Sequence, residues 1–248
     1  MTISSINFTT TRVTVYDSGK PLGTATGFFF RRQDGCEFLV TNRHVVIDEE
    51  RSFKPDTMQL RLHQNREFLD QNTTLTLSLY NDSGRSLWLE HSAYAMTKCD
   101  VIAIPMSPEV LTGNNYELFK KSSVTAYTTE LTDIPEVNPF GDVVVLGYPQ
   151  GFYDDHNNLP VYRKAMIASQ FGVPFQNNPY FLVDANLHQG MSGSPVVNSH
   201  HTLFSESAAV EGYKLFGIHS AQHMMNGEPL GLNVVWYSSL IVDIVQGD

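Results

Sequence analysis

Most of the chain consists of short runs in which hydrophobic and polar residues alternate or β-branched residues cluster. A period of two residues is typical of half-buried β-strands, because successive side chains point to opposite faces. Before residue 107 the pattern predicts strands over residues 11–17, 23–31, 36–42, 58–63, 74–80 and 101–106. After residue 141 it predicts strands over residues 142–148, 161–171, 180–186, 194–198, 213–221 and 232–238. Many short strands punctuated by turn residues are typical of a β-sandwich or of β-barrels.

Helical periodicity is rare. Residues 238–246 combine a serine start signal with apolar helical spacing, which predicts a short C-terminal helix, and a helical turn is possible after His44. Residues 107–141 carry several Pro and Asn residues and little periodicity, which is typical of a connector. The chain is therefore predicted to be all-β, with one unit over residues 1–106 and another over residues 142–248.

Composition narrows the class of protein. With 42% hydrophobic and 17% charged residues, the 248-residue chain has the composition of a globular protein. Its net charge of -10 disfavours nucleic acid and anionic membranes as partners. The first residues lack a signal pattern and no apolar run approaches a membrane span, so a cytoplasmic location is expected. Cys36 and Cys99 lack the spacing of a metal site and are expected to be buried free thiols.

The stretch "HQGMSGSPVV" (188–197) places Ser192 between two glycines, directly before a predicted strand. Such a stretch is compatible with an ordinary turn, because Gly tolerates positive φ and Ser bonds locally to the backbone. It is equally compatible with a nucleophilic serine. That function requires a base, a group that orients the base, and donors for a developing negative charge.

His44 and Asp100 are the candidates for the two partner roles. His44 directly follows a predicted strand, and Asp100 opens the apolar run "DVIAIP", where an unpaired carboxylate is costly. An aspartate that accepts from a histidine nitrogen fixes its tautomer, although Asp100 is also compatible with a strand-start cap. The chain order His44, Asp100, Ser192 is that of chymotrypsin-type triads and differs from subtilisins and α/β-hydrolases.

Five segments carry a resemblance to one family: "ATGFFF" (25–30), "TNRHVV" (41–46), "DVIAI" (100–104), "GYPQG" (147–151) and "DANLHQGMSGSPVV" (184–197). Together they resemble the trypsin/chymotrypsin-like serine peptidases, and most closely the bacterial HtrA-type protease domain without its PDZ domain. The resemblance implies two antiparallel six-stranded β-barrels, with His44 and Asp100 on the first and Ser192 on the second. It also implies an oxyanion hole made by the amides of Gly190 and Ser192, and peptide-bond hydrolysis without metal or cofactor.

The resemblance also marks candidates for substrate selection. Asn186 would lie at the base of the specificity pocket, and Gln222 would narrow its entrance. Ser220 would lie beside Asp100 and donate a hydrogen bond to it. The segment "GIH" at His219 resembles glutamyl endopeptidases, in which a histidine helps to receive an acidic side chain, although a pocket-wall histidine with satisfied hydrogen bonds is also compatible. The sequence therefore leaves open whether the substrate residue before the cleaved bond is acidic or small.

Some features depart from the family. Met191 replaces the aspartate that receives a freed N-terminal amine in digestive relatives, so activation by N-terminal cleavage is not expected, and regulation would need loop ordering or a partner protein. A trypsin-fold binding or scaffold protein without activity is the main alternative function, and an acyl hydrolase of another fold is a further one. The neighbouring pair His200 and His201 is expected in a hairpin loop and not in a metal site.

Overall fold

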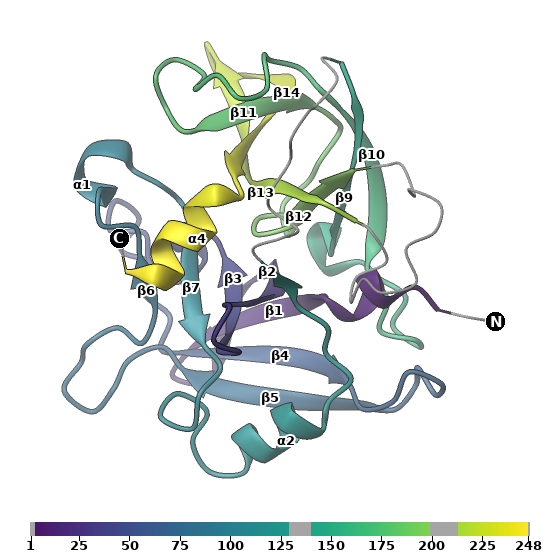
Figure 1. Cartoon of the computed structure of the whole chain (residues 1–248). Helices are drawn as coiled ribbons and strands as arrows, with labels where there is room; N and C mark the ends of the chain where they lie inside the picture. The colour runs from purple at the N-terminus through teal and green to yellow at the C-terminus, as the bar shows by residue number, and fades with distance from the viewer. Residues whose placement is uncertain (1–2, 129–139, 199–212, 248) are drawn as a thin grey trace.

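A computed structural model describes residues 3–128, 140–198 and 213–247 of the chain. Two β-rich halves lie against each other, and the short helix α4 (Ser239–Gln246) follows the last strand (Figure 1). The predicted all-β fold and the predicted C-terminal helix are confirmed.

The first half is built on a sheet of eight strands in the order β5-β4-β1-β2-β3-β7-β6, with β8 pairing in parallel with β2. Its strands are β1 (Thr10–Asp17), β2 (Lys20–Arg31), β3 (Glu37–Thr41), β4 (Thr57–His63), β5 (Asn72–Ser78), β6 (Leu89–Glu90), β7 (Ile102–Pro105) and β8 (Tyr127–Thr128). Strand β4 follows the predicted alternation, since Met58, Leu60 and Leu62 are buried. The two-residue strands β6 and β8 are additions to the six predicted ones.

The second half is a closed antiparallel barrel with the strand order β10-β11-β14-β13-β12-β9. Its strands are β9 (Asp142–Gly147), β10 (Val161–Ile167), β11 (Tyr180–Asp184), β12 (Pro195–Asn198), β13 (Leu215–Met225) and β14 (Glu228–Tyr237). Strand β12 pairs with β13 only from Leu215 to Ile218, whereas β13 continues to Met225. The outer part of β13 therefore pairs with β14 alone among the described strands.

The segment between the halves contains more structure than its sequence pattern predicts. Helix α2 (Asn115–Lys121) and strand β8 both lie within residues 107–141, and residues 129–139 lie outside the described part. Helix α2 contacts β5 of the first half. A further helix, α1 (Tyr94–Thr97), precedes Asp100. The predicted domain boundaries at residues 106 and 142 stay a prediction.

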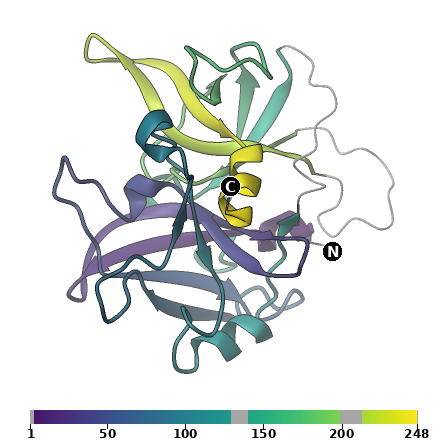
Figure 2. The same cartoon turned by 60° about the vertical axis from the view of Figure 1, so that its left-hand side comes forward.

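One apolar cluster joins the two halves. It contains Phe28 and Val40 from the first sheet, Ile218 and Trp236 from the barrel, and Ile241 from α4. Helix α4 follows the barrel and packs against β6 and β7 of the first half, between the two halves in Figure 2. Residues from both halves thus share one core, which fixes the position of one half relative to the other.

Two further predictions concern cysteines and membranes. Cys99 is buried as expected, but Cys36 is exposed, because it lies in the short hairpin between β2 and β3. Among the helices of the described residues, none has both the length and the apolar character needed to cross a membrane.

Candidate active site

His44 and Asp100 are held together by two hydrogen bonds, and a third bond from Asn42 fixes the backbone of Asp100. His44 lies in the 3-10 turn η2 (Arg43–Val45), directly after β3, while Asp100 lies just before β7. The backbone N–H of His44 donates to Asp100 Oδ1 at 2.9 Å, and the ring Nδ1 lies 2.6 Å from Asp100 Oδ2. The side chain of Asn42 donates to the backbone carbonyl of Asp100 at 2.7 Å. Since β3 and β7 are neighbours in the sheet, their pairing positions both groups.

The carboxylate determines the tautomer of the imidazole. An ionised carboxylate only accepts, so Nδ1 of His44 carries the proton and Nε2 has a free lone pair. Burial lowers the pKa of His44, but the hydrogen bond and the charge of Asp100 outweigh that effect, and the net pKa lies above its ordinary value. The ring is therefore a base whose strength Asp100 increases.

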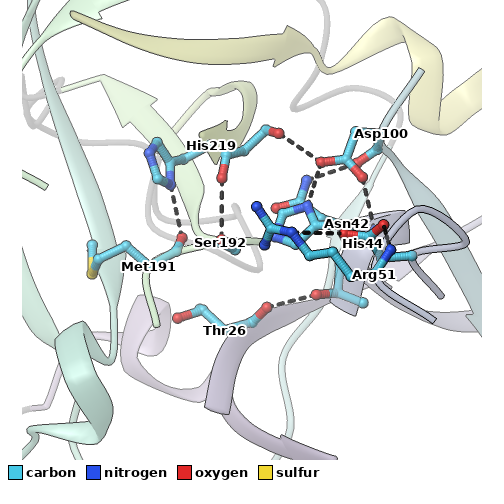
Figure 3. A network of polar contacts seen from close by, with 11 residues as sticks. Thr26, Asn42, His44, Arg51, Asp100, Met191, Ser192 and His219 are labelled. Atoms are coloured by element: carbon cyan, nitrogen blue, oxygen red, sulfur yellow. Dashed lines mark hydrogen bonds and ion pairs between the residues drawn. The ribbon is translucent and has the colours of Figure 1, made fainter. Parts of the chain in front are cut away.

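Ser220 connects Asp100 to Ser192. Its hydroxyl donates to Asp100 Oδ2 at 2.6 Å, which is the interaction expected from the resemblance. Its backbone carbonyl accepts a hydrogen bond from Ser192 Oγ at 3.1 Å (Figure 3). Ser192 and His44 line the same cleft, and in this structure the serine hydroxyl points at Ser220. Hydrogen bonds of a reacting serine are often long or differently aligned before substrate binds.

The turn that contains Ser192 has four consecutive carbonyl groups, each bonded to a different donor. The Gln189 carbonyl accepts from the backbone N–H of Gln150 at 2.5 Å, and the Gly190 carbonyl accepts from Thr26 Oγ1 at 2.8 Å. The Met191 carbonyl lies 2.9 Å from His219 Nδ1, and the Ser192 carbonyl accepts from the backbone N–H of Thr26 at 2.9 Å. Each peptide plane of this turn therefore has a fixed orientation.

The amides of the same turn behave differently from one another. The N–H groups of Met191, Gly193 and Ser194 donate to the carbonyls of His188, His219 and Met191. The N–H groups of Gly190 and Ser192 have no acceptor within the described residues. Because a trans peptide holds its N–H opposite its C=O, the Gln189 carbonyl on Gln150 turns the Gly190 N–H away from Gln150. Two free amides separated by one residue can bind a single oxyanion.

The glycines of this turn are required by their surroundings. Gly190 has φ +90° and Gly193 has φ +83°, a region that residues with a Cβ rarely adopt. A Cβ at Gly190 would also collide with the Tyr148 carbonyl, and one at Gly193 would collide with the Thr26 carbonyl. The sequence G-M-S-G is thus dictated by a backbone packed between both halves of the molecule.

Ser192 and His44 line a cleft of about 770 Å³ between the two halves. Ala25 and Phe53 line it from the first half, and Leu187 and Gln222 from the barrel. Ser220 and His219 lie on the same wall, so the cleft brings together most of the predicted site residues.

Asn186 is the predicted site residue that lies elsewhere. The expectation that it forms the base of the pocket is wrong, since its side chain is exposed, its carbonyl accepts from Arg163, and it does not line the cleft. The alternation that follows β11 explains this, because Ala185 and Leu187 are buried and Asn186 between them points outward. Asn233, which no sequence pattern singles out, lines the cleft instead.

His219 is almost fully buried, with 3% of its surface exposed. Its Nδ1 donates to the Met191 carbonyl, and its Nε2 lies 3.4 Å from Asn233 Oδ1. The Asn233 amide group donates to the Ala185 carbonyl at 2.7 Å, which turns its oxygen toward His219. Burial lowers the pKa of His219, so its ring is neutral near pH 7. His219 is thus a pocket-wall residue with one hydrogen bond, at Nδ1, because the lone pair of Nε2 faces the Asn233 oxygen, which cannot donate. Its place in the cleft keeps a role toward substrate open.

Two other expectations concern the turn and metals. Met191 is fully buried in the apolar core of the barrel, and its sulfur lies near Ser194 Oγ. No group of His, Cys, Asp or Glu suited to a metal ion occurs among the described residues. His200 and His201 lie outside the described residues.

The comparison with protein families agrees with this geometry. The sequence profile described as "Trypsin-like peptidase domain" matches residues 25–204, which include His44, Asp100 and Ser192. The chain belongs to the trypsin-like peptidase family. Members of this family are typically serine proteases, and their substrates are proteins. No curated protein sequence matches this trypsin-like peptidase.

Solved structures with the same fold include several proteases. A variant of the HtrA-type protease AlgW with a tripeptide superposes with a TM-score of 0.55 at 16% identity, covering 99% of this chain and 63% of that one. The serine endoprotease from Yersinia pestis gives 0.53 at 15% identity, covering 97% and 62%. The Rv3671c protease from M. tuberculosis in its active form gives 0.52 at 15% identity, covering 97% and 80%. The trypsin-like peptidase thus spans less than two thirds of the first two proteins, and the likeness establishes the fold.

Proposed function

We propose that this trypsin-like peptidase is a serine endopeptidase that hydrolyses protein substrates through Ser192, His44 and Asp100. One observation carries the proposal: His44, which is bonded to Asp100, lines the same cleft as Ser192, and the turn of Ser192 has two amides without an acceptor among the described residues. A nucleophile, an oriented base and preorganised donors together are what acyl transfer requires.

Acylation begins when Nε2 of His44 takes the proton of Ser192 Oγ. The oxygen attacks the carbonyl carbon of the scissile peptide, and the carbonyl π electrons move to its oxygen. Asp100 stabilises the imidazolium without taking its proton. The tetrahedral intermediate then collapses, the C–N bond breaks, and His44 gives its proton to the leaving amine. The product of this half-reaction is an ester on Ser192.

Deacylation repeats the sequence with water as the nucleophile. His44 takes a proton from the water, which attacks the ester carbonyl, and the C–O bond to Ser192 breaks as His44 returns the proton to Oγ. In both halves the negative charge develops on the carbonyl oxygen, where the Gly190 and Ser192 amides would receive it. One such donor lowers the barrier by about 3 kcal/mol in a well-studied protease.

The outer part of β13 offers a place for the peptide backbone. Ala221 and Gln222 line the cleft, and β12 ends its pairing with β13 at Ile218. An extended peptide can add to a free strand edge by main-chain hydrogen bonds. Substrate bound in this way would lie beside Ser192, which contacts the same strand through Ser220.

The first test combines two measurements on the purified chain. A fluorophosphonate label should modify wild type at Ser192, because only an activated serine reacts. A diverse peptide library should be cut by wild type and by Ser83→Ala, an exposed serine bonded to Asn81, but not by Ser192→Ala. Labelling without cleavage would point to a latent enzyme, whereas neither result would favour the binding or scaffold alternative.

A further inference from the structure

We propose that Thr26, on strand β2 of the first half, is a positioning residue for the turn of residues 189–194 in the second half. It holds this oxyanion turn in the form in which the Gly190 and Ser192 amides can bind an oxyanion. The inference rests on the proposed function, because it assigns a role in the same reaction to a residue that does not touch the reacting atoms. It also implies that the turn is formed without an activating cleavage.

Thr26 has all of its polar groups engaged. Its hydroxyl donates to the Gly190 carbonyl at 2.8 Å and accepts from the backbone N–H of Tyr148 at 3.1 Å. Its own N–H donates to the Ser192 carbonyl, and its carbonyl accepts from Thr41 Oγ1 at 2.8 Å. The side chain is fully buried, so no water competes for these bonds. Replacing the hydroxyl would leave both the Gly190 carbonyl and the Tyr148 amide unsatisfied.

Along the turn, the peptide planes that carry the two free amides alternate with peptide planes that Thr26 holds. The plane that carries the Gly190 N–H is held through the Gln189 carbonyl, and the plane that carries the Ser192 N–H is held through the Met191 carbonyl. Thr26 holds the two planes that follow these, through the carbonyls of Gly190 and Ser192. Each of the two amide planes shares a Cα atom with a plane that Thr26 fixes, at Gly190 for one and at Ser192 for the other. Thr26 therefore anchors the backbone next to both amides, while Gln150 and His219 hold the amide planes themselves.

No charged side chain within the turn fixes the orientation of its peptide planes. Residues 189–194 read Q-G-M-S-G-S and contain no ionisable side chain, and Met191 is buried among apolar neighbours. The turn is instead held by neutral hydrogen bonds from β2, from the 3-10 turn η3 (Pro149–Gly151) and from His219 on β13. Figure 3 shows Thr26 and His219 on opposite sides of Ser192. Because these donors belong to both halves, the turn is assembled when the halves pack.

The test compares Thr26→Val, which keeps the shape and removes the hydroxyl, with Thr26→Ser, which keeps the hydroxyl. Thr11→Val is the matched control, since Thr11 is equally buried and donates to the Arg61 carbonyl at 3.0 Å without touching the turn. We expect Thr26→Val to lower kcat roughly tenfold or more with KM within about twofold, because the donors it positions act on the transition state. Thr26→Ser should recover most of kcat, and Thr11→Val should keep it.

Amide hydrogen exchange over residues 187–194 gives a readout that does not depend on catalysis. Thr26→Val should exchange faster there than wild type, and Thr11→Val should not. Wild-type kcat in Thr26→Val, or an equal loss of kcat in Thr11→Val, would overturn the positioning role. If Thr26→Val does not fold, Thr26→Ala replaces it with the same expectations. A wild type that neither labels nor cleaves would instead refute the proposed function, while the exchange measurement would still test Thr26.

Discussion

The hydroxyl of Ser220 and the carboxylate of Asp100 meet at 2.6 Å across the boundary between the two halves. Ser220 lies on β13 of the barrel, and Asp100 precedes β7 of the first sheet. The carboxylate oxygen that accepts from Ser220 is the one that faces Nδ1 of His44. The position of the base in the first half therefore depends on a side chain of the second half.

Loss of that hydroxyl should impair catalysis more than folding. We expect Ser220→Ala to lower kcat about tenfold, because a hydrogen bond to a charged group is worth about 1.5–3 kcal/mol. Ser122→Ala is a suitable control, since Ser122 donates to the Phe119 carbonyl at the same 2.6 Å but lies outside the cleft. Steady-state kinetics and thermal melts of both variants check this. Equal kcat values for the two variants would show that the contact does not orient the base.

The pH dependence follows from the state of His44. The base must be neutral to take a proton, and its pKa lies above the ordinary value of 6.5. The rate constant kcat/KM should therefore rise with pH through a midpoint above 6.5, falling about tenfold per pH unit on the acid side. A pH profile with a neutral peptide substrate measures the midpoint. A midpoint well below 6.5 would mean that a group other than His44 limits the rate.

Asp100→Asn should keep the shape of the site and remove its charge. The amide would favour the wrong tautomer of His44 and withdraw the charge that raises its pKa. The same exchange in a chymotrypsin-like enzyme, the template for this mechanism, lowers kcat about 10⁴-fold. We expect a loss of that order here, together with a shift of the residual pH profile to lower pH. Fluorophosphonate labelling should slow in parallel, and an unchanged labelling rate would contradict the assignment.

Gly190 should not tolerate a side chain. Gly190→Ala places a Cβ against the Tyr148 carbonyl at φ +90°, which displaces the amide proposed to bind the oxyanion. We expect kcat to fall by roughly 10²-fold or more. Gly35→Ala is the matched control, because Gly35 has φ +89° and nothing within 4 Å of its Cβ position. That variant should lose only about 1 kcal/mol of stability from its backbone conformation and keep its kcat.

The strand pattern and the candidate site were largely accessible from sequence. His44, Asp100 and Ser192 are recognisable because each lies a few residues from a strand, within a short segment that resembles the family. The hydrogen bond from Ser220 to Asp100 was predicted, and the glycines at 190 and 193 have the positive φ that a tight turn needs. Local sequence is sufficient to predict a site residue where a backbone conformation or a charge requires a particular residue type.

Features that depend on tertiary contacts were not accessible in this way. Asn186 was misplaced because counting residues back from Ser192 does not reveal which way a side chain points after β11. The two-residue strands β6 and β8 are too short to carry a period, and α2 is set by its contact with β5. The role proposed for Thr26 depends on a hydrogen bond from its hydroxyl to the Gly190 carbonyl, 164 residues away along the chain, which no local pattern predicts.

The apolar cluster shared by the two halves determines how the molecule unfolds. Phe28 and Val40 pack in one cluster with Trp236 and with Ile241 of α4, so neither half can unfold without exposing the other half's share of that cluster. His44 belongs to the first half and Ser192 to the second, so the candidate site needs both halves folded. Heat or denaturant should therefore abolish activity in the same cooperative transition that unfolds this cluster, without an intermediate in which only one half is folded.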